Sequence, residues 1–434
     1  MEEEKFTKVE DALSKKQVGK EVNLRGWVYR HRVTKDVVFV LLRDSSGIIQ
    51  CTFKKGDVPE DVYDKAEQLK IESSVKIKGV VREDKRAPGG FEIEGKDLEI
   101  VHLAERFPIG RDLSEEFLLD VRHLWIRSQK MINVLKIRSK VFESIHEYFR
   151  NKGFYLTHSP ILTPGSAESG PDLFEVKFFD RKVYLTQTWQ LYAETILPAL
   201  EKIYTITPAF RAEKSRTIRH LAEYWTAEAE AAWYNLDDCI GLSEGLISYV
   251  CQKVGRECKK ELKTLGRDPD YLMSIKAPFP KITYTEALKI LEKDGMKVRW
   301  GKDLRTNEER QLMTHYDKPL VVSHYPKDIM AFYKPRDPNN PKVALCYDIL
   351  SPEIGIEIVG GSERDLNIEE MKKALKKAGE DPKKYEFYFD TRRYGAVPHS
   401  GFGLGIERLI MWICKLDHIR DAIPFPRTFR RCNP

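Results

Sequence analysis

The chain of 434 residues is 41% hydrophobic and 32% charged, and it carries a formal net charge of +6. A chain this long exceeds one ordinary hydrophobic core, so we expect two or three domains. It contains no run of about 18 apolar residues, and its start, Met-Glu-Glu-Glu-Lys, is the opposite of a signal peptide. These features predict a soluble protein with no membrane partner, and the small net charge neither requires nor excludes binding to nucleic acid.

The cysteines argue against a disulfide framework and against a zinc site. There are seven, an odd number, and no two of them have the two-residue gap of a zinc site. We interpret them as reduced and mostly structural, which is typical of a cytoplasmic protein.

The first hundred residues alternate apolar and polar positions in five short segments, with turn residues between them. Such a pattern predicts a small β-barrel, either an OB-fold, whose exposed face binds oligonucleotides, or another barrel of similar size. The predicted strands cover residues 22–29, 37–42, 48–53, 74–81 and 90–100, and one helix is expected near 59–68.

A polar stretch with Pro108 and Gly110 separates this region from a larger, mixed one. We predict an α+β protein with a barrel domain at 1–104, a hinge at 105–130 and a second domain at 131–434. In the second domain a helical periodicity runs over 131–152 and ends at Gly153, and a short strand over 154–158 follows. Further helices are expected at 236–265 and 367–379, and strands at 182–186, 202–207, 320–323, 344–350 and 357–359.

Two segments have the residues that a nucleotide site needs. From Phe210 the chain reads Phe-Arg-Ala-Glu-Lys-Ser-Arg-Thr-Ile-Arg-His-Leu-Ala-Glu-Tyr-Trp, which predicts a hairpin with Arg211 and Glu213 on one face of a strand. Arginines on a hairpin can hold a polyphosphate, a glutamate can accept from an adenine amino group, and an aromatic ring can stack on the base. A solvated charged hairpin is the alternative.

The second segment, residues 401–408, reads Gly-Phe-Gly-Leu-Gly-Ile-Glu-Arg and leads into an apolar stretch. Glycine at this density lets the backbone approach a ligand, and a helix N-terminus followed by an arginine suits phosphate. The alternative is a glycine-rich turn before a buried helix.

Together these segments resemble one family, the class II aminoacyl-tRNA synthetases. The charged hairpin is similar to their motif 2, residues 401–408 to motif 3, and the helix and strand before Pro160 to motif 1. The barrel resembles the anticodon-binding OB domain of the aspartyl, asparaginyl and lysyl subgroup, and the whole chain is most similar to asparaginyl enzymes of archaeal type. The resemblance implies a catalytic domain with a mainly antiparallel sheet flanked by helices, and a homodimer formed through residues 131–160.

The resemblance also implies a two-step reaction with ATP, Mg²⁺ and tRNA. An amino acid is activated as its adenylate and then transferred to the tRNA terminus without a protein nucleophile, so positioning and charge neutralisation must provide the rate. It assigns Arg211 and Arg408 as catalytic, and Asp348 and Glu357 as metal ligands beside Gly360, where the family often has serine. The implied ATP-binding residues are Arg211, Glu213, Arg219, His220, Leu221, Tyr224, Glu357, Gly405, Ile406, Glu407 and Arg408.

Three positions favour asparagine over aspartate as the amino acid. Arg364 matches the arginine that contacts the substrate side chain, Ala193 stands where aspartyl enzymes have a lysine, and Glu228 can accept from an amide. Trp189 departs from the small residue or proline expected beside them, and Glu228 could instead be a structural partner of Arg364. The implied amino-acid-binding residues are Glu168, Thr188, Gln190, Arg211, Glu228 and Arg364.

On the barrel the resemblance implies that Arg25, Phe39 and Gln50 contact the tRNA anticodon by stacking and hydrogen bonding, although an aromatic residue on a strand can equally belong to the core. Three other functions stay open at this point. They are an aspartyl-tRNA synthetase, discriminating or not, an ammonia-dependent asparagine synthetase with the same catalytic fold, and a non-catalytic RNA-binding relative.

Overall fold

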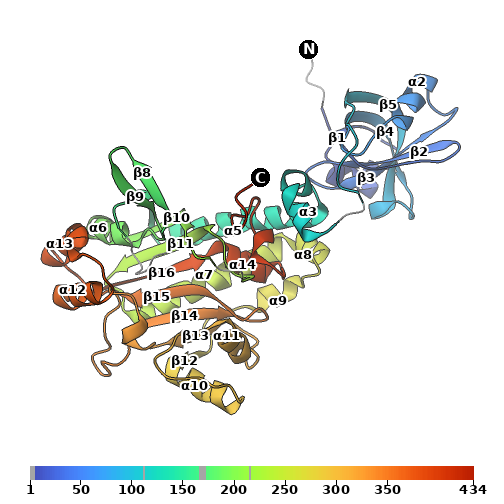
Figure 1. The fold of residues 1–434 in the computed structure, drawn as a ribbon. Helices are drawn as coiled ribbons and strands as arrows, with labels where there is room; N and C mark the ends of the chain where they lie inside the picture. The colour runs from blue at the N-terminus through green and yellow to red at the C-terminus, as the bar shows by residue number, and fades with distance from the viewer. Residues whose placement is uncertain (1–4, 111–112, 166–172, 215–216) are drawn as a thin grey trace. The chain divides into compact units, whose positions relative to one another are not determined.

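The computed structural model describes residues 5–110, 113–165, 173–214 and 217–434 (Figure 1). The chain divides into two compact units, Met1–Phe117 and Leu118–Pro434. The division lies inside the stretch 105–130 that the sequence predicts as a hinge, and that stretch also contains two short helices, α3 (Glu115–Asp120) and α4 (Arg122–Trp125). Each unit is described below on its own.

The first unit is a closed barrel with the strand order β1-β2-β3-β5-β4, which confirms the predicted five-stranded barrel. The alternation in sequence explains it, because residues such as Leu24, Val40 and Ile77 point inward to a buried core while their neighbours face outward. The strands are β1 (Glu21–Val33), β2 (Val37–Arg43), β3 (Ile48–Lys54), β4 (Ser74–Glu83) and β5 (Phe91–His102). The helical elements are α1 (Val9–Ala12), η1 (Lys15–Gln17), α2 (Glu60–Glu67) and η2 (Pro88–Gly90).

The second unit is built on an eight-stranded, mainly antiparallel sheet with the order β12-β13-β14-β15-β16-β11-β10-β6 (Figure 1). Within this sheet, as far as the structure describes it, only the pairs β6–β10 and β12–β13 are parallel. Its strands are β6 (Tyr155–Leu156), β10 (Lys202–Phe210), β11 (Glu223–Ala232), β12 (Lys281–Thr283), β13 (Leu320–Ser323), β14 (Cys346–Ser351), β15 (Ile356–Glu363) and β16 (His399–Gly405). A smaller sheet has the order β7-β9-β8, with β7 (Leu162–Thr163), β8 (Glu175–Phe178) and β9 (Arg181–Leu185).

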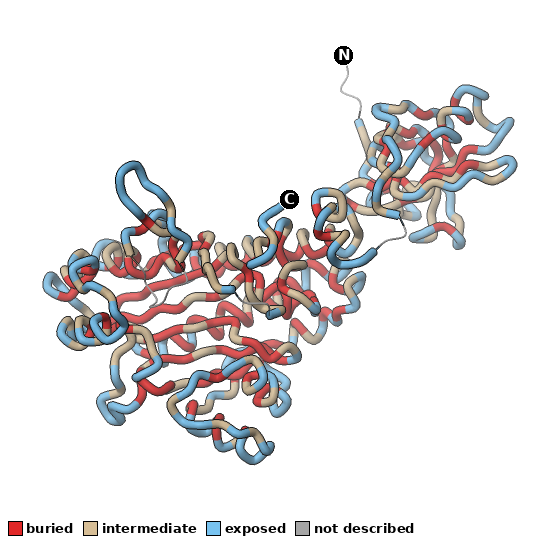
Figure 2. Tube along the Cα trace, viewed as in Figure 1, coloured by how far each residue is buried: buried red, intermediate tan, exposed pale blue. Residues whose placement is uncertain are grey.

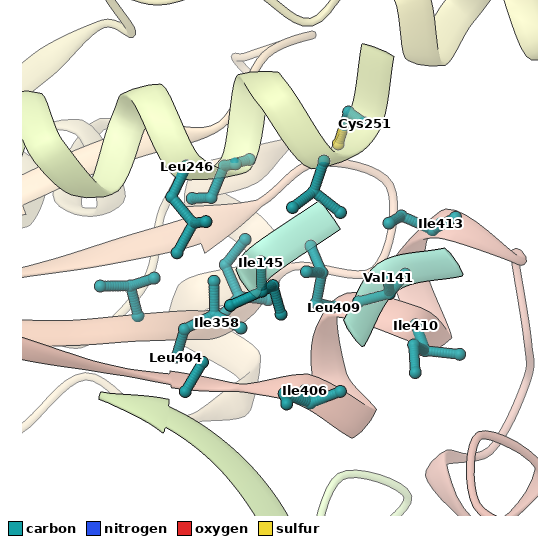
Figure 3. Close-up of a cluster of buried hydrophobic side chains, with 14 of the residues drawn as sticks. Val141, Ile145, Leu246, Cys251, Ile358, Leu404, Ile406, Leu409, Ile410 and Ile413 are labelled. Atoms are coloured by element: carbon teal, nitrogen blue, oxygen red, sulfur yellow. The ribbon is translucent and has the colours of Figure 1, made fainter. Parts of the chain in front are cut away.

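Two long helices and one short helix cover one face of the large sheet and form the main core with it. Side chains of α5 (Gln129–Asn151), α7 (Leu236–Glu257) and α14 (Ile406–Ile413) pack on apolar residues of β15 and β16 (Figure 3). Polar caps begin the first two helices: Ser128 accepts from the Met131 amide, and Asn235 and Asp238 form a capping box. In Figure 2 the central strands and the inner sides of these helices are buried.

The remaining helices surround the sheet. They are α6 (Gln190–Leu200), α8 (Lys259–Thr264), α9 (Pro269–Ser274), α10 (Tyr284–Lys293), α11 (Thr306–Met313), η3 (Lys327–Ile329), α12 (Ile368–Lys377), η4 (Pro382–Tyr385), α13 (Glu386–Arg393) and η5 (Ile419–Asp421). None of the described helices has both the length and the apolar character needed to cross a membrane.

Two local expectations need correction. Strand β10 ends at Phe210, so Arg211 and Glu213 lie just beyond it and do not share a strand face. The glycines before Arg408 form neither a turn nor a loop, because residues 399–405 are the strand β16, paired with β11 on one side and β15 on the other.

Candidate active site

The face of the sheet opposite the long helices carries a polar cavity of about 200 Å³. Strand β11 shows how the sequence builds it, since Ala227 and Ala229 pack into the core while Thr226 and Glu228 line the cavity. Of the residues predicted from the sequence, the cavity is lined by Thr188, Gln190, Arg211, Glu213, Arg219, His220, Leu221, Tyr224, Glu228, Asp348, Glu357, Arg364, Gly405, Glu407 and Arg408. Segments far apart in the chain therefore meet in one site.

Strand β16 is glycine-rich because its cavity face has no room for side chains at one position and must stay open at others. A Cβ atom on Gly401 would lie 2.2 Å from the Glu230 side chain and 2.4 Å from the Ala229 carbonyl oxygen. At Gly403 the nearest atom would be 3.6 Å away, an ordinary contact, and Gly403 and Gly405 both line the cavity. The glycines thus leave a floor of bare backbone, which a flat ligand can approach closely.

The residues of the predicted hairpin gather at one end of the cavity. The Arg211 guanidinium lies 6.0 Å from the ring centre of Tyr224 and 3.9 Å from Glu213 Oε1. The backbone amide of Arg211 donates to the Ala222 carbonyl oxygen at 2.9 Å, which holds the two arms of the hairpin together beyond β10. The cation, the carboxylate and the ring are therefore close enough to contact one nucleotide.

Arg219 and His220 extend this cationic end. Burial, followed by the nearby charges of Arg408, Arg219 and Arg211, lowers the pKa of His220 to about 4, so its imidazole is neutral at pH 7. Arg219 pairs with Glu309 of α11, a buried residue that sequence reasoning did not select. Burial raises the pKa of Glu309 to about 7 against the opposing effect of Arg219.

Arg408 approaches the cavity from the first turn of α14. Its Nη1 donates to the Glu357 carbonyl oxygen at 2.9 Å and to Glu357 Oε2 at 3.1 Å. Glu407 is buried at the edge of the cavity, and its carboxylate accepts from the Trp225 amide at 2.8 Å and pairs with Arg138 at 2.7 Å. Ile406, predicted to contact ATP, is fully buried in the main core and does not line the cavity (Figure 3).

Asp348 and Glu357 converge, as the resemblance implies, on the space above Gly360. A Cβ atom on Gly360 would lie 3.0 Å from Glu357 Oε1 and 3.4 Å from Asp348 Oδ1. Burial and the charge of Glu357 raise the pKa of Asp348 well above its usual range, whereas Arg408 and Arg211 outweigh burial and lower the pKa of Glu357. Two such oxygens suit Mg²⁺, which usually takes one or two carboxylates beside phosphate. In the described part of the chain no three His, Cys, Asp or Glu side chains cluster to hold a metal by themselves.

At the amino-acid end of the cavity, Glu228 has other partners than the arginine, Arg364, that the sequence suggested as one possibility. Glu228 is not a partner of Arg364 in the described contacts; it accepts from the Thr188 hydroxyl and from the Trp189 amide, the latter at 3.2 Å. Trp189 itself is fully buried in a core cluster that also contains Ala193. The tryptophan therefore does not shape the cavity with its ring, and its backbone helps to orient Glu228.

Arg364 pairs instead with Glu230, which sequence reasoning missed. Its Nε donates to both carboxylate oxygens of Glu230, at 3.1 and 3.2 Å, and Glu194 Oε1 lies 3.7 Å from the same nitrogen. Glu194 also accepts from Gln190 Nε2 at 2.9 Å and pairs with Arg392. The sequence Glu228-Ala229-Glu230 could have pointed to Glu230, because residues two apart on a strand share a face.

The surroundings of Glu194 keep its carboxylate ionised although it is fully buried. Tyr388 donates to it at 2.9 Å, and His399 Nε2 lies 2.9 Å from Oε2. Burial alone would raise the pKa of Glu194, but Arg392, His399 and Arg364 lower it below its usual range. Glu168, the remaining residue predicted to bind the amino acid, lies outside the described residues.

On the barrel, the three predicted anticodon residues lie on three strands, Arg25 on β1, Phe39 on β2 and Gln50 on β3. Phe39 lies opposite Arg32 of β1 and Thr52 of β3, and Gln50 lies opposite Leu41. Arg25 is instead opposite Lys76 of β4 and packs over the ring of Phe6, 4.7 Å from its centre. The exposed cation beside Phe39 is thus Arg32. Gln50 Nε2 donates to Glu92 at 2.9 Å, so Glu92 lies beside it.

Comparison with known proteins agrees with this geometry. Residues 114–429 match the model of tRNA synthetases class II (D, K and N), and residues 22–101 match that of the OB-fold nucleic acid binding domain. The asparagine–tRNA ligase of Thermoplasma acidophilum is 48% identical over 98% of this chain and 99% of its own length.

Solved structures extend the similarity to the whole fold. Asparaginyl-tRNA synthetase from Pyrococcus horikoshii, complexed with asparaginyl-adenylate, superposes with a TM-score of 0.95 at 43% identity, covering 100% of both chains. The enzyme from Entamoeba histolytica, also with asparaginyl-adenylate, gives a TM-score of 0.87 at 32% identity over 96% of this chain and 97% of its own. This chain therefore belongs to the class II tRNA synthetases of the D, K and N group and, within that group, to the asparagine–tRNA ligase family.

Proposed function

We propose that this protein is an asparagine–tRNA ligase. It joins L-asparagine to AMP, with release of pyrophosphate from ATP, and then transfers the asparaginyl group to a terminal hydroxyl of tRNA. The observation that carries the proposal is the single cavity in which Arg211 and Arg408 lie at one end and Arg364 at the other, with Glu228 beside Thr188. The asparaginyl-adenylate complexes of two similar structures support it.

The first step needs placement and charge neutralisation more than a protein nucleophile. The substrate carboxylate oxygen attacks the α-phosphorus, the bond to the bridging oxygen breaks, and pyrophosphate leaves with its electron pair. Arg211, Arg219 and Arg408 supply fixed positive charge where negative charge accumulates, and the neutral His220 can donate a hydrogen bond. Glu213 and Tyr224 beside Arg211 are suited to the adenine amino group and to the face of the base.

The charge balance around Arg364 favours asparagine. Arg364 and Arg392 are matched by Glu194 and Glu230, so these four buried side chains carry no net charge. A carboxylate side chain would add a buried negative charge there, whereas an amide oxygen can accept from Arg364 without one. Ala193 is fully buried and supplies no cation, which agrees with the same choice.

Magnesium fits the oxygens of Asp348 and Glu357, which converge above Gly360. When bound there it would neutralise phosphate charge, and the two carboxylates would hold it together with the phosphate oxygens. For tRNA, the barrel face with Arg32, Phe39 and Gln50 offers a cation, a ring and an amide for single-stranded bases, as anticodon recognition requires. The buried, unbridged thiols of six cysteines fit a reducing, cytoplasmic setting.

ATP–pyrophosphate exchange with each amino acid tests the function. We expect exchange with asparagine to exceed exchange with aspartate by about 100-fold or more in kcat/KM, the range that a buried charge or unpaired polar group can provide. Charging assays should then show that asparagine is attached to tRNA(Asn) and that aspartate is not. Faster exchange with aspartate would identify an aspartyl-tRNA synthetase, and synthesis of free asparagine from aspartate, ATP and ammonia would identify an asparagine synthetase. The variant Arg408→Ala is the control, because it should lose exchange with either amino acid.

A further inference from the structure

We propose that a surface formed by Tyr192, Lys383, Lys384 and Phe387 binds the single-stranded 3′ end of tRNA and guides its terminal nucleotide to the active site. We call these four residues the acceptor surface. The inference rests on the proposed function, because the transfer step requires a tRNA hydroxyl to reach the activated amino acid. It adds a binding site that the cavity and the barrel do not provide.

The acceptor surface is continuous with the active site. A second, small cavity of about 20 Å³ is lined by Tyr192, Lys384 and Phe387, and also by Gln187 and Thr188. The last two residues line the active-site cavity as well, at its amino-acid end. A space of this size holds no nucleotide, so we interpret it as the inner end of a path along which a chain end approaches Thr188 from outside.

The acceptor surface has a stacking platform. The rings of Tyr192 on α6 and Phe387 on α13 stack with their centres 5.2 Å apart and an angle of 28° between their planes. Both residues are only partly buried, so the pair is accessible at the surface. Aromatic rings of this kind stack on the bases of single-stranded nucleic acids without regard to sequence, and the 3′ end that all tRNAs share is single-stranded.

The acceptor surface also carries two exposed lysines, Lys383 and Lys384. Among the described residues neither forms an ion pair. Three of the four lysines of the neighbouring helix α12 differ in this respect. Lys372 pairs with Glu369 at 3.3 Å, Lys373 with Glu370 at 3.1 Å and Lys377 with Asp328 at 3.8 Å. Two exposed lysines that form no ion pair among the described residues, next to an aromatic stack, match the phosphates and bases of one strand.

The segment that carries the lysines is fixed, as a binding surface requires. Asp381 caps η4 by accepting from the Lys383 amide at 3.0 Å, and Tyr385 of the same turn is buried. Tyr385 belongs to a core cluster with Tyr388 and Phe389 of α13. Because the backbone is anchored on both sides of the lysines, the acceptor surface exists before tRNA binds and little ordering is needed on binding.

The test separates activation from transfer. The double variant Lys383→Gln/Lys384→Gln and the single variant Phe387→Ala should keep the wild-type rate of asparagine-dependent ATP–pyrophosphate exchange, measured without tRNA. We expect kcat/KM for tRNA in charging to fall by about tenfold or more in each, in keeping with the loss of two phosphate contacts or one base stack. Lys372→Gln/Lys373→Gln on α12 is the matched control and should change neither rate. The lysine variants alter only exposed side chains, so the fold is preserved.

Binding of truncated tRNA sharpens the test. The wild type and Lys383→Gln/Lys384→Gln should differ in Kd for intact tRNA but not for tRNA lacking its four 3′-terminal nucleotides. A difference that persists with truncated tRNA places the lysines on another part of tRNA and overturns the proposal, as does unchanged charging by the variants. A loss of exchange equal to the loss of charging would also overturn it. If the wild type itself fails to activate asparagine, the proposed function fails instead, and the two failures are distinct.

Discussion

At the scale of single residues, Asp348 and Glu357 allow a sharp prediction about the metal. Two carboxylates that face the same space above Gly360 repel each other, and burial together with Glu357 raises the pKa of Asp348. A raised folded-state pKa means that the charged form of Asp348 costs stability above its usual pKa, and that this cost grows as the pH rises toward the folded-state value. The substitution Asp348→Asn removes the charge with little change in shape.

We therefore expect Asp348→Asn to have opposite effects on stability and on metal use. Without nucleotide or metal at pH 7.5, its Tm should be higher than that of the wild type by a few degrees, about the change expected for 1 kcal/mol. In ATP–pyrophosphate exchange it should need roughly tenfold more Mg²⁺ for half-maximal rate, because one of two protein ligands has lost its charge. A lower Tm, or an unchanged Mg²⁺ requirement, would show that Asp348 has only a structural role.

Single residues also show how far sequence reasoning reached. The residues predicted for ATP, apart from Ile406, line one cavity because each belongs to a segment whose pattern already contained its chemistry. Ile406 does not line the cavity, because an apolar side chain at the start of an amphipathic helix packs into the core, and its contact with ATP stays a prediction. The pairing of Arg364 with Glu230 could not be predicted with confidence in the same way, since Glu228 is chemically identical and only the register of β11 against its neighbours distinguishes the two.

At the scale of elements, strand β16 gives a matched pair of substitutions. On its cavity face Gly401 is covered by the Glu230 side chain and the Ala229 carbonyl, whereas a Cβ atom on Gly403 would make only ordinary contacts, the nearest at 3.6 Å with Glu228. Gly401→Ala should lower the free energy of unfolding by about 1–3 kcal/mol, as overpacking does, and should displace Glu230 from Arg364. Gly403→Ala should leave the free energy of unfolding within about 0.5 kcal/mol of wild type.

Urea unfolding of the two variants would check this difference, and exchange kinetics would follow its effect on the site. Since Gly401→Ala disturbs the partner of Arg364, we expect KM for asparagine to rise while KM for ATP changes less. Equal destabilisation by both substitutions would mean that the strand tolerates no Cβ atom anywhere on this face. The proposed difference between Gly401 and Gly403 would then be wrong.

Elements were predictable where periodicity is strong and less so where it is interrupted. The barrel strands and the helix α5 appear at the predicted places because alternation and the 3.6-residue period directly reflect which side is buried. The glycine-rich strand β16 was not predicted as a strand, because glycine is unfavourable in strands unless a neighbouring side chain or ligand occupies the missing volume. Here Glu230 and the cavity occupy it, and neither is visible in the local sequence.

At the scale of the whole molecule, the two units have separate hydrophobic cores, one inside the barrel and one between the large sheet and its helices. The change from a short-strand pattern to a mixed one allowed this division to be predicted. The strand order of the large sheet could not be predicted beyond the hairpin of β10 and β11. Strand β6 pairs with β10, and β11 pairs with β16, across long stretches of chain, and periodicity carries no information about pairing partners.

The exposed edge of the large sheet predicts the assembly state. Among the strands that the structure describes, β6 pairs only with β10, and Tyr155 and Leu156 on it are 59% and 38% exposed. Ile161 and Leu162, just after it, are 39% and 38% exposed. An open strand edge next to exposed apolar side chains favours association with another chain, and a symmetric dimer would bury this edge in both subunits. We propose that the protein is a homodimer through this edge, which lies at the end of the motif 1 region.

Charge placed at this edge should separate the subunits. We expect the wild type to sediment with twice the chain mass of 50.5 kDa. The double variant Tyr155→Glu/Leu156→Glu should shift toward the monomer, with a dimer dissociation constant raised by about tenfold or more. The reason is that the apolar centre of an interface carries most of its binding energy. Trp300→Glu is the control: this residue is 44% exposed and follows α10 beside β12, the opposite edge of the sheet, so the dimer should persist. Both replaced side chains in the double variant are exposed, so their loss leaves the core of each subunit intact. A variant that stays dimeric would place the interface elsewhere, whereas a monomer that still activates asparagine would show that each cavity is complete within one chain.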